Sequence, residues 1–458
     1  MVTVARMVNR MSDQLRLATR SLLNGTASQA LKAKAMAAGI LALLLLPQLL
    51  FTGSSLRVSV FRTKERWAHQ FEQSRLLRAM VLSMHGGSAA SHDRARMYYE
   101  EQLPEFRRAA ASYHLHQYWQ DVGRDIKSPT MGWYALIGAR IHGMARLYRE
   151  SGRDDFKVEK DKCIMYEFLT GNNLPICPLL GRWPTLEGFV ADLRTGHAFD
   201  NATAWPVFLK TCHLTQGSSA STRPLFSKAA AVGAAEDLAA WLATKWEYRA
   251  DDWERPWRKD GNLLTDHLTP GIILQSPSTL TFNPETSKKQ VVEIKVEVFW
   301  GRAYAGVITD IKNFGHGASV ATRGIRGLGH RPEGVIEAFP DGFNHFVLST
   351  VYLPTSGPGS WFHWIMDEDH LRKCAWPLAE KTARIMGIDA VRIDIFLIKG
   401  DPTGCVINEN SLSDGMGYGH HMEFMSKLWA EPHVGKTYKV YNNAKRIYRQ
   451  TEADVPTN

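Results

Sequence analysis

The sequence predicts an α+β protein in which a membrane-spanning helix and a helical stem precede one large mixed domain. Three observations carry this prediction. An uncharged apolar segment lies near the N-terminus, charged and apolar residues alternate at helical spacing from residue 57 to 154, and short β-type runs separate helices after that. Strands mixed with helices at this density are typical of an α+β or α/β domain of enzyme size.

Composition excludes a disordered protein and leaves the ligand class open. The chain has 458 residues, of which 44% are hydrophobic and 22% charged, so it can bury a large core. Its net charge of +9 suits an anionic ligand or surface, such as a nucleotide, a nucleic acid, an acidic glycan or membrane headgroups. Five widely spaced cysteines without a CxxC pair argue against a zinc ribbon. We expect most of them to be buried thiols. One or two disulfide bonds are an alternative if the domain is lumenal.

The N-terminal region predicts a membrane anchor. Residues 1–34 form a basic tail with a single acid, Asp13, and residues 35–56 contain no charge. About 20 residues of helix span a bilayer core. The basic flank favours a cytoplasmic N-terminus, which places the bulk of the chain in the lumen of the secretory pathway or outside the cell. The alternative is an organelle transit peptide, because the leader is rich in arginine and poor in acids.

The remaining chain divides into three predicted parts. Residues 57–154 mix charged and apolar positions at helical spacing and form the stem or accessory region. Residues 155–450 carry the β-type runs and form the large mixed domain, and residues 451–458 form a flexible tail.

The stretch "AVRIDIFLIKGDPTGCVINENS", residues 390–411, predicts a charged site on two strands. Residues two apart in a strand share a face, so Arg392 and Asp394 point the same way. A hairpin centred on an Asp401-Pro402 turn places Glu409 opposite Asp394 and Ser411 opposite Arg392. Two facing carboxylates repel unless a cation lies between them. That cation is either Mg²⁺ bridged to phosphates or Arg392 itself on an exposed hairpin face.

Upstream segments offer further cations. In "WPVFLKTCHLTQGSS", Lys210 ends an apolar strand and is followed by a loop with Gly217, Ser218 and Ser219. Such a loop can wrap phosphate oxygens, although it is also an ordinary turn. Lys162 begins a helix-like segment, "DKCIMYEFLTGNNLPICP". In "VVEIKVEVFWG", Lys295 lies on a polar face with acids on either side, which taken alone predicts a solvent-exposed face.

These pieces, in this order, resemble the ATP-grasp superfamily over residues 161–419. "PVFLKTCHLTQGSS" resembles its phosphate-covering element, "DK…LP" its earlier nucleotide-binding lysine segment, and "VRID…INENS" its two magnesium strands. "WEYRADDW" and "IKVEVFWGRAYAG" are most similar to the TupA-like group, which is linked to teichuronopeptide and capsular polysaccharide synthesis. The resemblance implies two α/β lobes that clasp ATP.

The resemblance also implies roles for individual residues. By position, the residues that would contact ATP are Lys162, Lys210, Gly217, Ser218, Ser219, Gln275 and Lys295. Asp394 and Glu409 would bind Mg²⁺, completed by either Asn410 or Ser411. Side-chain parity along this strand separates Glu409 with Ser411 from Asn408 with Asn410, and we favour the set with Glu409 because a metal that faces phosphates needs anionic ligands. Arg392 would stabilise charge on an acyl-phosphate intermediate, and Lys210 would share in catalysis. Gln275 departs from the family pattern, which has an acid that binds the ribose.

The implied activity is ligation of a carboxylate to an amine, driven by ATP with Mg²⁺. The expected substrates are ATP, an anionic carboxylate compound such as an acidic glycan, and an amine such as an amino acid; no nucleic acid is expected. Two alternatives are an ATP-dependent kinase or transferase that modifies a glycan, and an inactive scaffold.

Overall fold

The computed structural model describes the chain from residue 88 onward, with internal gaps. The described residues are 88–214, 221–249, 258–277, 281–283, 288–290, 292–310, 317–322, 336–340, 370–398, 400–412 and 421–456. The basic tail, the predicted membrane segment and the loop with Gly217, Ser218 and Ser219 lie outside them. Within these ranges, no helix has both the length and the hydropathy that crossing a bilayer requires.

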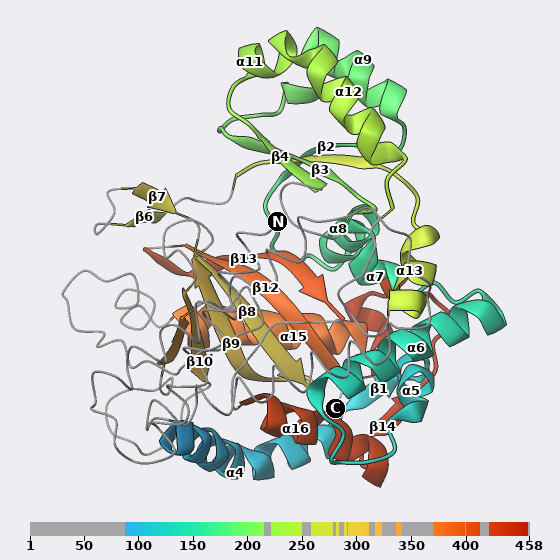
Figure 1. The fold of residues 1–458 in the computed structure, drawn as a ribbon, viewed down its shortest axis with the longest axis vertical. Coiled ribbons are helices and arrows are strands. Elements are labelled where there is room, and N and C mark those ends of the chain that lie inside the picture. Colours follow the sequence, from blue (N-terminus) through green and yellow to red (C-terminus); the bar gives the residue numbers. More distant parts are fainter. Residues whose placement is uncertain are drawn as a thin grey trace, which may run out of the picture. The chain divides into compact units, whose positions relative to one another are not determined.

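A six-stranded antiparallel sheet carries the two strands of the predicted charged site (Figure 1). Its strand order is β11-β10-β9-β8-β12-β13. The strands are β8 (Val292–Phe299), β9 (Arg302–Asp310), β10 (Gly317–Thr322), β11 (Ile336–Pro340), β12 (Ala390–Ile398) and β13 (Asp401–Ser411). The non-consecutive neighbours β8 and β12 place Lys295 directly across from Asp394.

Strand β8 shows why this sheet forms and where the sequence prediction was wrong. Its alternate residues Ile294, Val296 and Val298 are buried in the main core, as a period of two requires. The opposite face was expected to be exposed to solvent, yet Glu293 is 1% exposed and Glu297 2%. Lys295, which shares this face, pairs with Glu293 and with Asp394 of β12. This polar face therefore belongs to an enclosed charged site.

The β12–β13 hairpin confirms the predicted register and corrects the predicted turn. Arg392 pairs with Ser411, and Asp394 with Glu409. However, β13 begins at Asp401 and Ile398 pairs with Asp401, so Asp401 and Pro402 belong to the strand and not to the turn. Gly400 has φ +81°, which glycine adopts without the strain of a side chain. The pairing of β12 with β13 changes register at two places between this turn and Asp394, and one of them lies directly after Asp394.

A second, four-stranded antiparallel sheet carries Lys210 and Gln275 (Figure 1). Its order is β2-β5-β3-β4, formed by β2 (Leu179–Trp183), β3 (Val207–Thr211), β4 (Thr222–Leu225) and β5 (Ile272–Gln275). Helices α9 (Leu186–Thr195), α11 (Lys228–Gly233) and α12 (Ala235–Trp246) lie on one face of it. Val207 and Leu209 of β3 pack into this second core, so Lys210 between Leu209 and Thr211 points to the other face.

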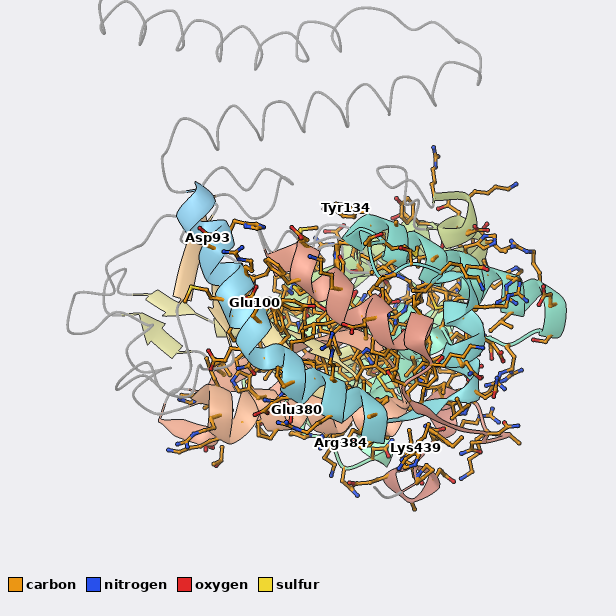
Figure 2. The ribbon with its side chains drawn as sticks, turned by 90° about the horizontal axis from the view of Figure 1, so that it is seen from below. Asp93, Glu100, Tyr134, Glu380, Arg384 and Lys439 are labelled. Carbon is orange, nitrogen blue, oxygen red and sulfur yellow. A yellow bond between two sulfur atoms is a disulfide. The ribbon has the colours of Figure 1, made fainter. Side chains whose placement is uncertain are left out.

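The segment predicted as a stem is mainly helical where it is described, apart from the three-residue strand β1 (His114–His116). It contains α4 (Ser88–Ser112), α5 (Gln117–Val122) and α6 (Trp133–Ser151). Asp93 and Glu100 mark α4 in Figure 2, and α4 packs along α16 (His421–Gly435). Trp119 and Trp133 lie in the same core as Val296 of β8. These helices thus support the large sheet directly.

The other elements connect or complete these layers. They are α7 (Lys157–Lys160), α8 (Lys162–Gly171), α13 (Arg258–Asp266), the π-helix η3 (Leu371–Ala375), α15 (Trp376–Met386), and the strand pairs β1 (His114–His116) with β14 (Lys439–Tyr441) and β6 (Thr281–Asn283) with β7 (Lys288–Gln290). Glu380 and Arg384 mark α15 in Figure 2. A 3-10 turn, Glu452–Asp454, lies in the predicted tail, where Glu452 pairs with Lys381.

Four of the five cysteines form two disulfides. Cys163 of α8 is bonded to Cys212, which directly follows β3. Cys374 of η3 is bonded to Cys405 of β13. The fifth, Cys177, is a buried free thiol. We expected mainly free buried thiols, and only Cys177 follows that expectation.

Candidate active site

Asp394 lies at the centre of a buried charge cluster on the large sheet. Arg392 donates to it from the same strand face, with Nε 2.7 Å from Oδ1 and Nη2 3.0 Å from Oδ2. Lys295, directly across on β8, donates to Oδ2 as well. Burial alone would raise the pKa of Asp394, but Arg392 and Lys295 outweigh burial and lower it. Asp394 is therefore an anion already neutralised by protein cations.

Lys295 is shared between two carboxylates. Its Nζ lies 2.9 Å from Oε2 of Glu293, in addition to its contact with Asp394. Burial would lower the pKa of Lys295, yet Asp394 and Glu293 raise it well above its ordinary value. This lysine thus stays charged in the enclosed site.

Lys210 extends from the four-stranded sheet toward β13. Its Nζ lies 3.4 Å from the hydroxyl of Tyr166 and 3.4 Å from Oδ1 of Asn408. Burial lowers the pKa of Lys210, and the nearby charge of Glu409 opposes this shift in part. No hydrogen-bonded carboxylate neutralises Lys210 among the residues that the structure describes, so its charge is available to an anion.

Lys162 lies at the start of α8, where the local sequence fixes it. Asp161 caps the helix by accepting from the backbone N–H of Ile164 at 3.2 Å. The backbone N–H of Lys162 donates to Cys212 O at 2.9 Å, and its Nζ donates to Leu214 O. Burial lowers the pKa of Lys162, and Glu409 opposes the shift. Buried Lys162 and half-buried Lys210 therefore come from different elements and lie close to one acid.

Glu409 is that acid, and its surroundings differ from those of Asp394. It is half-buried on β13. Burial lowers the pKa of both Lys162 and Lys210, and the negative charge of Glu409 opposes this shift in both. In the described parts of the chain, its carboxylate makes no hydrogen bond or ion pair. Glu409 therefore offers oxygen atoms to a ligand or a metal ion.

A β-bulge brings Asn408 into the site beside Glu409. Asp394 pairs with Glu409, but the next residue, Ile395, pairs with Ile407, so Asn408 is the extra residue. Strict alternation would have assigned Asn408 and Glu409 to opposite faces. The bulge overrides that parity, and the Asn408 side chain reaches Lys210.

Sequence reasoning missed three residues of this cluster. Asn408 was set aside by the parity argument, and Glu293 was assigned to an exposed face. Tyr166, whose hydroxyl lies 2.9 Å from Asn408 O and 3.3 Å from Gln275 Oε1, was not considered. The strict alternation around Lys295 was the signal for Glu293. No local pattern indicates Tyr166, since its partners lie on other strands.

Three predicted site residues have other partners. Gln275 is buried, its Oε1 lies 3.3 Å from the Tyr166 hydroxyl, and its amide nitrogen donates to Cys177 O at 3.3 Å. Ser411 Oγ donates to Glu159 Oε1 at 3.3 Å. Asn410 is fully buried, and its amide nitrogen lies 3.8 Å from the sulfur of Met386. Of the two residues considered to complete a metal site, Ser411 is the one that is not fully buried.

Comparison with known proteins gives only distant matches to solved structures. No protein-family model and no curated protein matches this chain. Solved structures do match. D-alanyl-alanine synthetase A from Vibrio cholerae is 11% identical, with 61% of this chain and 65% of that chain covered and a TM-score of 0.29. The ATP-grasp ligase PsnB, complexed with minimal precursor, Mg and ADP, is 14% identical over 66% and 67%, with a TM-score of 0.29.

The third example is the biotin carboxylase domain of 2-oxoglutarate carboxylase from Hydrogenobacter thermophilus, in complex with MgADP, ADP and bicarbonate. It is 13% identical, with 71% of this chain and 55% of that chain covered and a TM-score of 0.35. The chain thus spans between about half and two thirds of the length of these proteins. Such distant similarity carries no conclusion about activity, which depends on the residues of the site.

Proposed function

We propose that the chain is an ATP-grasp enzyme that joins a carboxylate to an amine at the expense of ATP. One observation carries the proposal: Lys162, which is buried, and Lys210, which is half-buried, come from separate elements and lie near Glu409 and next to the Asp394 cluster. Buried lysines without a paired carboxylate are costly unless an anion binds them. The phosphates of ATP supply such an anion, and the order of these residues along the chain resembles that of the superfamily.

The donor set also fits Mg²⁺. Glu409 has carboxylate oxygens without a protein partner in the described chain, and these are the hard ligands that Mg²⁺ takes alongside phosphate oxygens. Ser411 lies two residues further on the same strand. Asp394 holds Lys295 and Arg392 in place, so its oxygens become ligands only if one of these cations turns toward the phosphates. Bound Mg²⁺ would offset the repulsion between Glu409 and the phosphates.

The protein residues contribute charge and alignment to the reaction. The carboxylate substrate attacks the γ-phosphate to form an acyl phosphate with release of ADP, and the amine then displaces phosphate. Lys162 and Lys210 hold the phosphate chain, while Arg392 and Lys295 face the charge that develops at the transferred group. The Gly217, Ser218 and Ser219 loop follows directly on the segment that ends at Leu214, which supports its proposed place over the phosphates.

We further propose that the substrate is an acidic glycan or similar polymer and that residues 35–56 anchor the enzyme in a membrane. The uncharged segment behind a basic tail supports the anchor, and the two disulfides suit an oxidising lumen. Arg323, Arg326 and Arg331 in the segment 313–334 supply positive charge for an anionic acceptor. The sequence similarity to the TupA-like group points in the same direction.

An ADP-release screen of the full chain tests the activity. The chain is incubated with MgATP and pairs of acidic sugars and amino acids. A ligase releases ADP and free phosphate only when both a carboxylate and an amine are present. A kinase leaves the phosphate on the product, and a scaffold releases nothing.

Variants then test the site assignment. Lys210→Met abolishes turnover if Lys210 holds the phosphates, because the uncharged side chain of similar length cannot replace the ammonium group. Lys228→Met is the matched control, since Lys228 pairs with Asp200 on the exposed surface. Normal turnover of Lys210→Met, in protein that unfolds at the wild-type temperature, contradicts the assignment.

A further inference from the structure

Asn408 connects the two sheets through a single side chain. Its Oδ1 lies 3.4 Å from Nζ of Lys210, which belongs to the four-stranded sheet. Its Nδ2 lies 2.7 Å from Oε1 of Glu293, which belongs to the six-stranded sheet. The amide therefore joins the lysine nearest the proposed phosphates to a buried acid on the central strand β8.

Glu293 fixes which way the Asn408 amide points. An ionised carboxylate only accepts hydrogen bonds, so the amide must turn its NH₂ group toward Glu293 and its oxygen toward Lys210. Glu293 cannot rotate away easily, because its other oxygen holds Lys295 at 2.9 Å and its side chain is almost fully buried. The orientation of Asn408 is thus set by an acid that does not itself reach Lys210.

The backbone of Asn408 is fixed as well. The Tyr166 hydroxyl lies 2.9 Å from the carbonyl oxygen of Asn408 and also 3.4 Å from Nζ of Lys210. An ammonium group only donates, so Lys210 donates to the Tyr166 hydroxyl. The single hydroxyl proton of Tyr166 is then donated to the carbonyl oxygen of Asn408. Lys210 thus meets two neutral acceptors, both held by other parts of the site.

We propose that Glu293 and Asn408 form a positioning pair that fixes the place of the Lys210 ammonium group for phosphate binding. This inference rests on the proposed function. Two neutral acceptors at 3.4 Å, a long distance for hydrogen bonds, orient Lys210 without cancelling its charge. A carboxylate in either place would hold the lysine more tightly and compete with a phosphate.

The choice of an amide at position 408 follows from this role. Aspartate there would place a second carboxylate 2.7 Å from Glu293, where the amide nitrogen now lies. An apolar residue would leave both Glu293 and Lys210 without this contact. Asparagine alone among residues of this size donates to the acid and accepts from the lysine.

The test measures MgADP binding to the full chain by titration calorimetry. Glu293→Gln keeps the shape of the side chain but lets it donate as well as accept, so the Asn408 amide is free to turn its NH₂ group toward Lys210. We expect Glu293→Gln and Asn408→Ala each to weaken MgADP binding about ten-fold, the range of one charge-assisted hydrogen bond. We expect Lys210→Met to weaken it at least as much.

The decisive comparison combines the changes. If the pair acts through Lys210, Asn408→Ala weakens MgADP binding no further in a chain that already carries Lys210→Met. A further loss of about ten-fold in that background overturns the inference, and so does wild-type affinity in both single variants. If Lys210→Met itself binds MgADP normally, the proposed function fails together with the inference. The two failures are thereby distinguished.

Asn172→Ala is the matched control for a merely structural amide. Asn172 is buried, donates to Phe168 O and Gln450 O, and accepts from the backbone N–H of Glu452. Its loss lowers the unfolding temperature without changing MgADP affinity. Should Asn408→Ala fold poorly, Glu293→Gln carries the test, because it preserves side-chain volume.

Discussion

Glu409 lies directly opposite Asp394 across the β12–β13 ladder, yet only Asp394 is paired with protein cations. Arg392 and Lys295 both donate to Asp394, which is 1% exposed. Glu409 is half-buried and makes no hydrogen bond within the described residues. One carboxylate thus holds the cluster together, while the other is open to a ligand.

Glu409→Gln is therefore expected to remove Mg²⁺-dependent nucleotide binding with little effect on stability. Among the described residues Glu409 makes no hydrogen bond or ion pair, and the change removes only its longer-range attraction to Lys162 and Lys210, so the free energy of unfolding should fall by about 1 kcal/mol or less. Titration of the protein with ADP, once with Mg²⁺ and once without it, measures the binding. Unchanged Mg²⁺ dependence would show that the ion uses other ligands.

Asp394→Asn is expected to destabilise the fold as well as abolish activity. The change removes the negative charge that Lys295 and Arg392 share in an enclosed site. Breaking a buried ion pair costs about 3 kcal/mol. Urea unfolding of Asp394→Asn beside Glu409→Gln measures the difference. Equal stability of the two variants would contradict the division of roles.

The Cys163–Cys212 disulfide is expected to stabilise the fold substantially. Its sequence separation is 49 residues, for which the loop-closure estimate is about 4 kcal/mol. The double change Cys163→Ser and Cys212→Ser should lower the free energy of unfolding by a large part of that amount. Cys177→Ser is the control, because Cys177 is buried but free. A similar loss in both variants would mean that packing, and not the crosslink, accounts for the effect.

Asp389 is expected to make stability depend on pH in the acid range. Its oxygens contact Arg140 of α6 and, at 2.6 Å and 2.7 Å, Trp429 and His433 of α16. Burial alone would raise the pKa of Asp389, but Arg140 and His433 lower it to about 2. Because the folded pKa lies below the unfolded value, the stabilisation is complete above about pH 4 and is lost toward pH 2.

Asp389→Asn should remove this component, which amounts to about 2 kcal/mol. Urea unfolding between pH 2 and pH 5 measures the free energy of unfolding for both proteins. The two proteins are compared by the slope of the free energy of unfolding against pH. The cost of leaving Arg140 without its partner is the same at each pH and does not change that slope. Parallel curves would assign the acid sensitivity to other groups.

Local sequence was enough to predict several elements of the site. The two-residue period of a strand puts Arg392 and Asp394 on one face, and the hydrophobic pattern on both sides of the turn sets the pairing with Glu409. The same reasoning placed Lys210 on an apolar strand and Lys162 at a helix start. These features depend on neighbours in the chain, which a sequence displays directly.

Tertiary structure alone decided which charges meet. Lys295 neutralises Asp394 because β8 and β12, 99 positions apart at these residues, are neighbours in the sheet. The bulge at Asn408 reverses the expected parity, and only contact with Lys210 and Glu293 gives that residue a role. Such pairings are set by long-range packing and by the cost of burying an unpaired charge, neither of which a local pattern records.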